Sequence, residues 1–153
     1  MTLSDELLVS ELSTVAQACA AGGDAVYHLE VYQNATGDNA SNYPCFVYRR
    51  TDYAAELELS GQANVEDETY EVTVVSQDSD ALRCMARAVQ KTNKYEFLQH
   101  LQTTRPDVLD WIVEHESEQN EFAMEQQDKG YKTATMLVRI VLDTTEGTPT
   151  CPP

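Results

Sequence analysis

Apolar residues near the amino terminus recur every three or four positions, which is the spacing of one face of an α-helix. Four residues form this row: Leu8, Leu12, Val15 and Cys19. Ser4 is a suitable N-cap, and the acidic residues Asp5 and Glu6 favour the positive end of the helix dipole. We expect a helix over residues 4–19, followed by a stop at Gly22-Gly23.

Apolar and polar residues alternate in later segments, which is the period of a half-buried β-strand. The pattern predicts five strands, over residues 27–32, 45–48, 69–74, 109–113 and 133–142. Between the first two strands, the polar residues 34–42 carry turn signals.

A second amphipathic pattern begins at the capping sequence Asp78-Ser79-Asp80. Its apolar face consists of Leu82, Met85, Ala86 and Val89. Its opposite face is basic and consists of Arg83, Arg87, Lys91 and Lys94. Residues 95–101 predict a short further helix, which Arg105-Pro106 ends because proline excludes a helical conformation before it.

The order of these elements, helix, strands, helix and strands, differs from the alternating pattern of a parallel α/β fold. We therefore expect an α+β fold, with a mainly antiparallel sheet and two helices packed on one face. A chain of 153 residues suits one domain with one core, here residues 1–143. The Thr- and Pro-rich residues 144–153 are expected to form a flexible tail.

The charge of the chain is strongly negative and unevenly distributed. Its 26 acidic and 10 basic residues give a net charge of −16, and no Lys or Arg precedes Arg49. Acidic residues dominate 106–130, whereas the second predicted helix is basic on its outer face. Because such a chain repels phosphate backbones, specific nucleic-acid binding through an electrostatic footprint is excluded.

The expected location of the protein in the cell follows from the apolar content of the chain and from its amino terminus, and it determines the expected state of the cysteines. No stretch approaches the roughly 20 apolar residues of a membrane-spanning helix, and the amino terminus lacks a signal-peptide pattern. We expect a protein that stays in the cytoplasm where it is made and does not enter a membrane. Four widely spaced cysteines are then predicted to be free and mostly buried thiols: Cys19, Cys45, Cys84 and Cys151.

The histidines do not predict a catalytic site. His28 falls on the outward face of the first strand, His100 in the short helix, and His115 in the acidic run. None lies in a motif that pairs a nucleophile with a base, so solvated histidines are the preferred interpretation. We expect neither enzymatic activity nor a cofactor.

Acidic residues follow the fourth predicted strand as a dense row, namely Glu114, Glu116, Glu118, Glu121 and Glu125. Alternating carboxylates can hold a metal ion, but residues 110–130 lack the glycine turn and distal Glu of a calcium loop. A pair of glycosidase carboxylates would need an apolar pocket that nothing here predicts. A solvated acidic face is the preferred interpretation.

The basic face of the second helix admits two interpretations. It either contacts an acidic surface of a neighbouring subunit or is simply solvated, with Lys91 and Lys94 near the negative end of the helix dipole. The sequence leaves both open.

Several of these patterns together resemble the tail completion, or tail terminator, family of long-tailed bacteriophages. The resemblance covers residues 3–143. It begins with the first helix and a strand, followed by a second strand that starts in the sequence Tyr43-Pro44-Cys45-Phe46-Val47-Tyr48. It continues with the strand 70–74, which leads directly into the helix that begins at Ser79, and it ends with the last strand, 133–142. Two departures are the length of 95–108 and the acidic stretch 114–128, which enlarges the last hairpin.

The resemblance implies a structural protein of the virion neck. Such subunits form a ring, commonly of six copies, which caps the tail tube protein and joins it to the head connector or stopper, while DNA passes without specific binding. The implied subunit interface includes Arg83, Arg87, Lys91, Tyr43 and Phe46. The acidic row Glu114, Glu116, Glu118, Glu121 and Glu125 is the implied lumen or interface face.

Two other classes of function remain as alternatives. An acidic chain can mimic DNA and inhibit a DNA-binding protein by occupying its basic surface. A hydrolase would require a pocket in which His28 or His115 meets a carboxylate.

Overall fold

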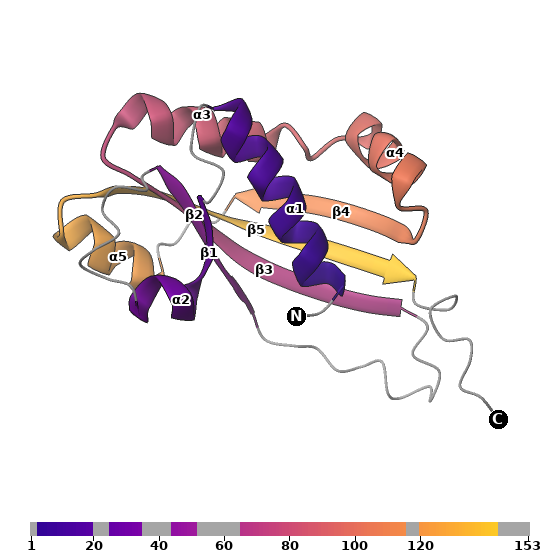
Figure 1. Cartoon of the computed structure of the whole chain (residues 1–153), viewed down its shortest axis with the longest axis horizontal. Coiled ribbons are helices and arrows are strands. Elements are labelled where there is room, and N and C mark those ends of the chain that lie inside the picture. Colours follow the sequence, from indigo (N-terminus) through magenta and orange to yellow (C-terminus); the bar gives the residue numbers. More distant parts are fainter. Residues whose placement is uncertain (1–2, 20–24, 35–43, 52–64, 116–119, 144–153) are drawn as a thin grey trace.

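A computed structural model of the chain describes residues 3–19, 25–34, 44–51, 65–115 and 120–143 (Figure 1). Its helices are α1 Leu3–Ala18, α2 Leu29–Asn34, α3 Ser79–Gln90, α4 Tyr95–Thr104 and α5 Glu121–Asp128. Its strands are β1 Val26–His28, β2 Cys45–Arg50, β3 Val65–Ser76, β4 Val108–His115 and β5 Lys132–Asp143. The predicted flexible tail, 144–153, and the glycines at 22 and 23 lie outside the described residues.

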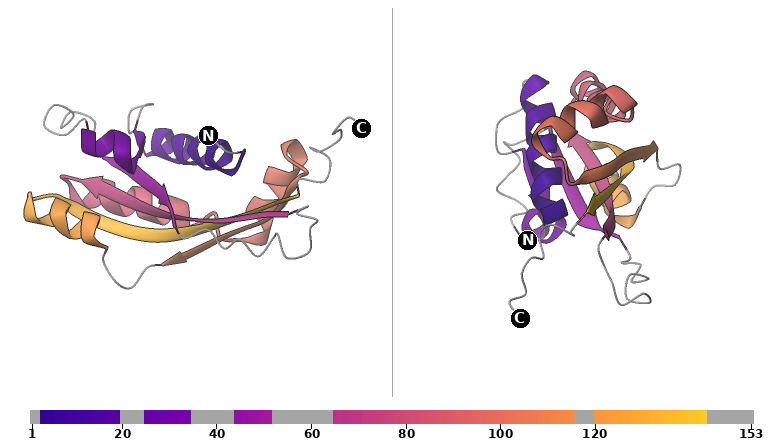
Figure 2. Two further views of the ribbon diagram at one scale, coloured as in Figure 1. Left: turned by 90° about the horizontal axis from the view of Figure 1, so that it is seen from below. Right: turned by 90° about the vertical axis from the view of Figure 1, so that its right-hand side faces the viewer.

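The five strands form one sheet in the order β1-β2-β3-β5-β4. β1 pairs in parallel with β2, and the other three neighbouring pairs are antiparallel. β3 and β5 pair along 12 residues each and run the length of the molecule beside α1 (Figure 2). The prediction of an α+β fold with a mainly antiparallel sheet is confirmed.

One face of the sheet is the main apolar face. Alternate residues of the central strands point to it and are fully buried: Tyr70, Val72, Val74, Met136, Val138, Ile140 and Leu142. Because successive side chains of a strand point to opposite faces, this row follows directly from the alternating sequence. Burying a side chain of this size contributes roughly 1.5–3 kcal/mol, so the row accounts for much of the core.

Three helices cover this apolar face: α1, which crosses in front of the strands in Figure 1, and α3 and α4, which lie along the top of that view. α1 buries Leu8 and Leu12, and α3 buries Met85 and Val89. α4 contributes its apolar side chains toward Trp111 of β4, whose indole Nε1 donates a hydrogen bond to Thr92 Oγ1 at 2.9 Å. The predicted helices of these three segments are thus confirmed.

Two further helices lie at one end of the molecule, on the left of Figure 1: α2 and α5. The hydroxyl of Tyr32 in α2 donates to Gln126 Oε1 of α5 at 2.9 Å. The Tyr32 ring also packs edge-on against Phe122, with centroids 5.4 Å apart. α5 is held to the second face of the sheet, since Gln127 Nε2 donates to Thr133 Oγ1 at 2.8 Å. The prediction of only two helices, both on one face, was therefore wrong.

α2 occupies the segment whose alternation predicted a longer first strand. β1 ends at His28, whose ring Nδ1 accepts the backbone N–H of Glu30 at 3.1 Å and so satisfies a donor of the first helical turn. Val31 is 56% exposed, whereas Tyr32 is buried against α5. Packing on α5 therefore favours a helix in residues 29–34, although the alternating sequence there predicted a strand.

The outer edge of β4 has part of its backbone satisfied by side chains. Alternate residues of an edge strand direct their N–H groups away from the paired strand. Here the N–H of Val113 donates to Asn93 Oδ1 at 3.1 Å, and that of Trp111 donates to Asp110 Oδ1 at 3.0 Å. The outer edge of β4 therefore presents fewer free backbone N–H groups than an edge strand of its length would otherwise do.

Two cysteines do not follow the prediction of free thiols. Cys19 at the end of α1 and Cys84 in α3 form a disulfide, with Cα atoms 6.1 Å apart. The fold brings them together because α1 packs along α3, which the sequence separation of 65 residues conceals. Cys45 is free and buried, and burial raises the pKa of its thiol to about 12. Cys151 lies outside the described residues.

Candidate functional site

The basic face predicted for the second helix is present on α3. The carboxylate of Asp78 caps the helix by accepting the N–H groups of Asp80 and Ala81, each at 3.3 Å. This cap fixes the rotation at which Met85 and Val89 point into the core. The opposite face carries the exposed Arg83 and Arg87, and Lys91 follows as the C-cap. Lys94 is also exposed but lies beyond the helix, at the N-cap of α4, so its predicted place on this helix face was wrong. We name these four cations the basic stripe.

Most of the basic stripe has no ionic partner among the residues that the structure describes. Arg83 approaches Asp80 at 3.9 Å, but both side chains are well exposed, at 60% and 89%, so the pair contributes little. In the described residues, no ion pair is formed by Arg87, Lys91 or Lys94. Three cations are thus available for an acidic surface of another molecule.

The predicted acidic row is divided between a strand and a helix. Glu114 is exposed on β4, whereas Glu121 and Glu125 are exposed on α5. Glu116 and Glu118 lie outside the described residues. We name the exposed carboxylates of α5 the acidic ridge: Glu121, Glu125 and Asp128.

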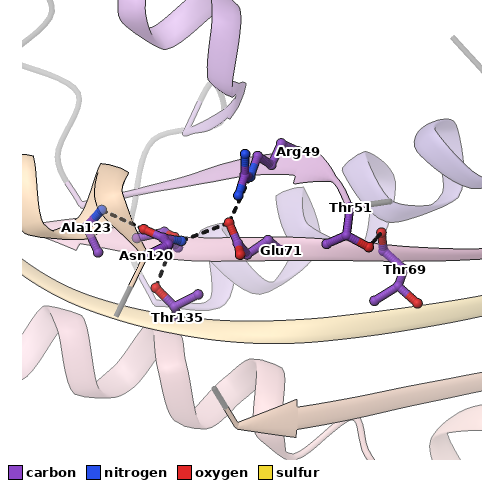
Figure 3. Close-up of polar contacts among 8 residues, drawn as sticks. Arg49, Thr51, Thr69, Glu71, Asn120, Ala123 and Thr135 are labelled. Atoms are coloured by element: carbon purple, nitrogen blue, oxygen red, sulfur yellow. Dashed lines mark hydrogen bonds and ion pairs between the residues drawn. The ribbon is translucent and has the colours of Figure 1, made fainter. Parts of the chain in front are cut away.

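Asn120 places the acidic ridge by joining α5 to the sheet. Its side-chain oxygen accepts the N–H of Ala123 at 2.6 Å, which caps the helix, and its Nδ2 donates to Glu71 Oε1 at 2.9 Å (Figure 3). Glu71 also accepts from Arg49 Nε at 2.8 Å. These contacts orient α5 so that Phe122, 9% exposed, points inward while the ridge points outward.

Two residues of the predicted interface have different outcomes. Phe46 is 0% exposed and lies in the core on β2, so its side chain is not available to a neighbour. That prediction was wrong, because the apolar face of β2 packs beneath α1. Tyr43 lies outside the described residues.

The second face of the sheet also carries charge away from α5. Asp67 accepts from Arg139 Nε at 2.8 Å, and this hydrogen bond lowers the pKa of the Asp67 carboxyl. Here Glu114 lies beside the ion-paired surface and is exposed. The open part of this face therefore mixes ion-paired side chains with the half-buried apolar residues Ile112, Leu137 and Val141, in contrast to the apolar face beneath α1.

A buried carboxylate beneath the start of α1 was not predicted. Glu68 is 4% exposed, and its Oε1 accepts from Arg50 Nη1 at 3.2 Å, while Oε2 has no hydrogen-bond partner. Burial raises the pKa of Glu68, against the opposing effect of Arg50. Nearby, Ser4 Oγ donates to Glu66 Oε1 at 2.8 Å. The alternation of β3 places Glu68 on the apolar face, and this was the available signal.

The described histidines have local structural contacts. His28 packs edge-on against Tyr48, with ring centroids 5.3 Å apart, and His100 is exposed on α4. The side chain of His115 lies outside the described part of the chain. Among the described residues, no group of three His, Cys, Asp or Glu side chains is placed to hold a metal ion.

A hollow of about 270 Å³ lies between α2 and α5, lined by Leu29, Gln33, Arg49, Glu121, Phe122 and Glu125. Two of the residues that line it, Glu121 and Glu125, belong to the acidic ridge, and a third, Arg49, forms an ion pair with Glu71. The hollow is therefore part of the α5 surface.

None of the helices in the described segments is long and apolar enough to cross a bilayer. No protein-family model matches the chain, and no curated protein was found to be similar to it.

Proposed function

We propose that this chain is a structural subunit of the tail terminator type, which forms a ring on the tail tube and joins it to the head connector of a phage particle. One observation carries the proposal: the basic stripe, which among the described residues approaches an acid only through Arg83, and the acidic ridge on α5 lie on opposite faces of one sheet. In Figure 1, α3 lies along the top of the molecule and α5 lies at its left-hand end.

This charge separation supports a ring rather than a symmetric pair. In an isologous dimer the same patch meets itself, so a stripe of Arg83 and Arg87 would face like charge. A heterologous contact instead brings the stripe of one copy to the ridge of the next, and such contacts close into a ring when the rotation allows.

The acidity of the chain supports passage of DNA through such a ring. A net charge of −16 repels phosphates over about one Debye length, roughly 8–10 Å at moderate salt. The exposed Glu114 on the open face of the sheet is a candidate for the lumen. The proposed location is the neck of the virion, after assembly in the host cytoplasm.

The test is the mass of the assembly that the purified chain forms, alone and with the tail tube protein of the same phage. Native mass spectrometry is expected to give a closed oligomer, and electron microscopy is expected to show it as a ring at the end of the tube. Persistent monomers under both conditions would contradict the proposal.

A second candidate, an acidic inhibitor that mimics DNA, is favoured by the exposed carboxylates on α5 and β4. It predicts tight binding to a DNA-binding protein that weakens steeply with salt. A pull-down at low salt that recovers no DNA-binding protein would exclude it.

A further inference from the structure

α5 presents an outer surface with charge at its sides and an apolar side chain between them. Phe122, Ala123 and Gln126 face inward and are buried. Met124 is 54% exposed and lies on the outer surface beside Glu121 and Glu125. An exposed Met is an adaptable apolar side chain that packs well in an interface.

α3 presents the complementary outer surface. Arg83 and Arg87 are exposed, and Cys84 beside them is bonded to Cys19 at the end of α1. The two surfaces therefore match in charge.

The spacing of the charges also matches. Glu121 and Glu125 are four residues apart, as are Arg83 and Arg87. With a rise of about 1.5 Å per residue, both pairs are separated by about 6 Å along their helices. Two helices packed side by side can therefore form both ion pairs at once.

The charges beyond these pairs indicate the relative direction of the helices. α5 ends at the exposed cation Lys129, and α3 begins at the exposed Asp80 but ends at Lys91. In a parallel arrangement with Glu125 opposite Arg87, Lys129 would face Lys91. In an antiparallel arrangement with Glu125 opposite Arg83, Lys129 lies near Asp80, and the helix dipoles are also opposed favourably.

We propose that α5 of one copy is the docking site for α3 of the next copy, with the two helices antiparallel. Glu125 then pairs with Arg83, and Glu121 pairs with Arg87. This inference rests on the proposed ring, and it names the two elements that form its repeated contact.

The central experiment reverses the charges on each side and then on both. R83E/R87E and E121K/E125K are each expected to weaken subunit association about 100-fold, as expected for losing and inverting two close charge pairs. Each substitution changes the charge by two, so the variants have net charges of −20 and −12 compared with −16 for the wild type. The combined variant keeps −16, so its recovery cannot be attributed to net charge.

E121K/E125K is informative on its own, because it lowers the overall repulsion between copies and yet is expected to weaken their association. A matched control is E6K/E96K, which changes two exposed acids on α1 and α4 by the same total charge. The control is expected to assemble at least as well as the wild type. Circular dichroism melting checks that every variant is folded.

The direction of the helices is tested by single exchanges. In the antiparallel arrangement, E121K restores the association of R87E better than that of R83E, whereas parallel helices reverse this order. Sedimentation velocity, with and without the tail tube protein, measures the association of each pair.

The outcomes separate the two proposals. A wild-type ring that tolerates R83E/R87E or E121K/E125K would overturn the α3–α5 contact and leave the proposed function standing. Failure of the combined variant to recover while all variants remain folded would also overturn the contact. A wild-type chain that stays monomeric, alone and with the tube protein, would overturn the proposed function and this contact with it.

Discussion

Replacing Cys84 with Ser removes the disulfide that joins the end of α1 to α3. The bridge spans 65 residues of sequence, and in the chain-entropy description its loss costs about 4 kcal/mol, because the unfolded chain gains the freedom that the closed loop denied it. For a chain of this size, each kcal/mol lowers Tm by about 2–4 °C. We therefore expect Tm to fall by roughly 8–16 °C.

Thermal unfolding followed by circular dichroism measures this change. Dithiothreitol is expected to lower the Tm of the wild type to nearly that of the Cys84→Ser variant, because Cys84 is exposed and accessible to the reagent. The same reagent is expected to leave the variant unchanged. Peptide mapping without reductant provides the direct control, since the peptides that contain Cys19 and Cys84 are expected to remain joined.

Two results would refute this reasoning. A Tm of the variant within about 2 °C of the wild type would show that the loop constraint contributes little to stability. Separate Cys19 and Cys84 peptides from the unreduced, oxidised protein would show that the bridge does not form.

Three other changes test the packing around the site. Asn120→Ala removes the N-cap of α5, and we expect the free energy of unfolding to fall by about 1–2 kcal/mol. Amide hydrogen exchange should become faster in α5 alone, and unchanged exchange there would contradict the role of the cap. Thr92→Val removes the acceptor of the hydrogen bond that the single Trp, Trp111, donates, and we expect the free energy of unfolding to fall by about 1 kcal/mol. The fluorescence spectrum of Trp111 should also shift, and an unaltered spectrum would contradict the hydrogen bond. Burial raises the pKa of Glu68, so its contribution to stability is fully present below its unfolded pKa and is lost as pH rises through its folded pKa. Urea titrations should therefore show Glu68→Gln gaining stability relative to the wild type as the pH rises from about 4.5, the ordinary pKa of a Glu carboxyl, and a difference that stays constant with pH would contradict this.

The sequence predicted α3 well because two independent signals agree there. Asp78 marks its beginning with a capping carboxylate, and Met85 and Val89 follow at helical spacing. Both signals are local, so no knowledge of the rest of the fold was needed. The exposure of Arg83 and Arg87, which depends only on the rotation of this helix, was predicted for the same reason, whereas Lys94 lies beyond its end.

α2 and α5 were not predicted because their formation depends on each other. Each is short, with 6 and 8 residues, and an isolated helix of that length is unstable in water. Tyr32 and Phe122 pack together only after the chain has brought the two segments side by side. Local alternation in one segment and dense acidic charge in the other concealed this contact.

The disulfide and the burial of Phe46 could not be read from the sequence for a similar reason. Spacing alone does not show that Cys19 and Cys84 meet, because their proximity follows from the packing of α1 on α3. Phe46 was placed at an interface by resemblance, whereas its position on β2 directs it beneath α1.

The side-chain caps on β4 have a consequence for assembly at high local concentration. At high concentration an open sheet edge invites strand addition between copies and hence irreversible aggregation. Asn93 and Asp110 occupy two of the backbone donors that such an intruding strand would need. These two caps therefore disfavour fibrils that grow through β4.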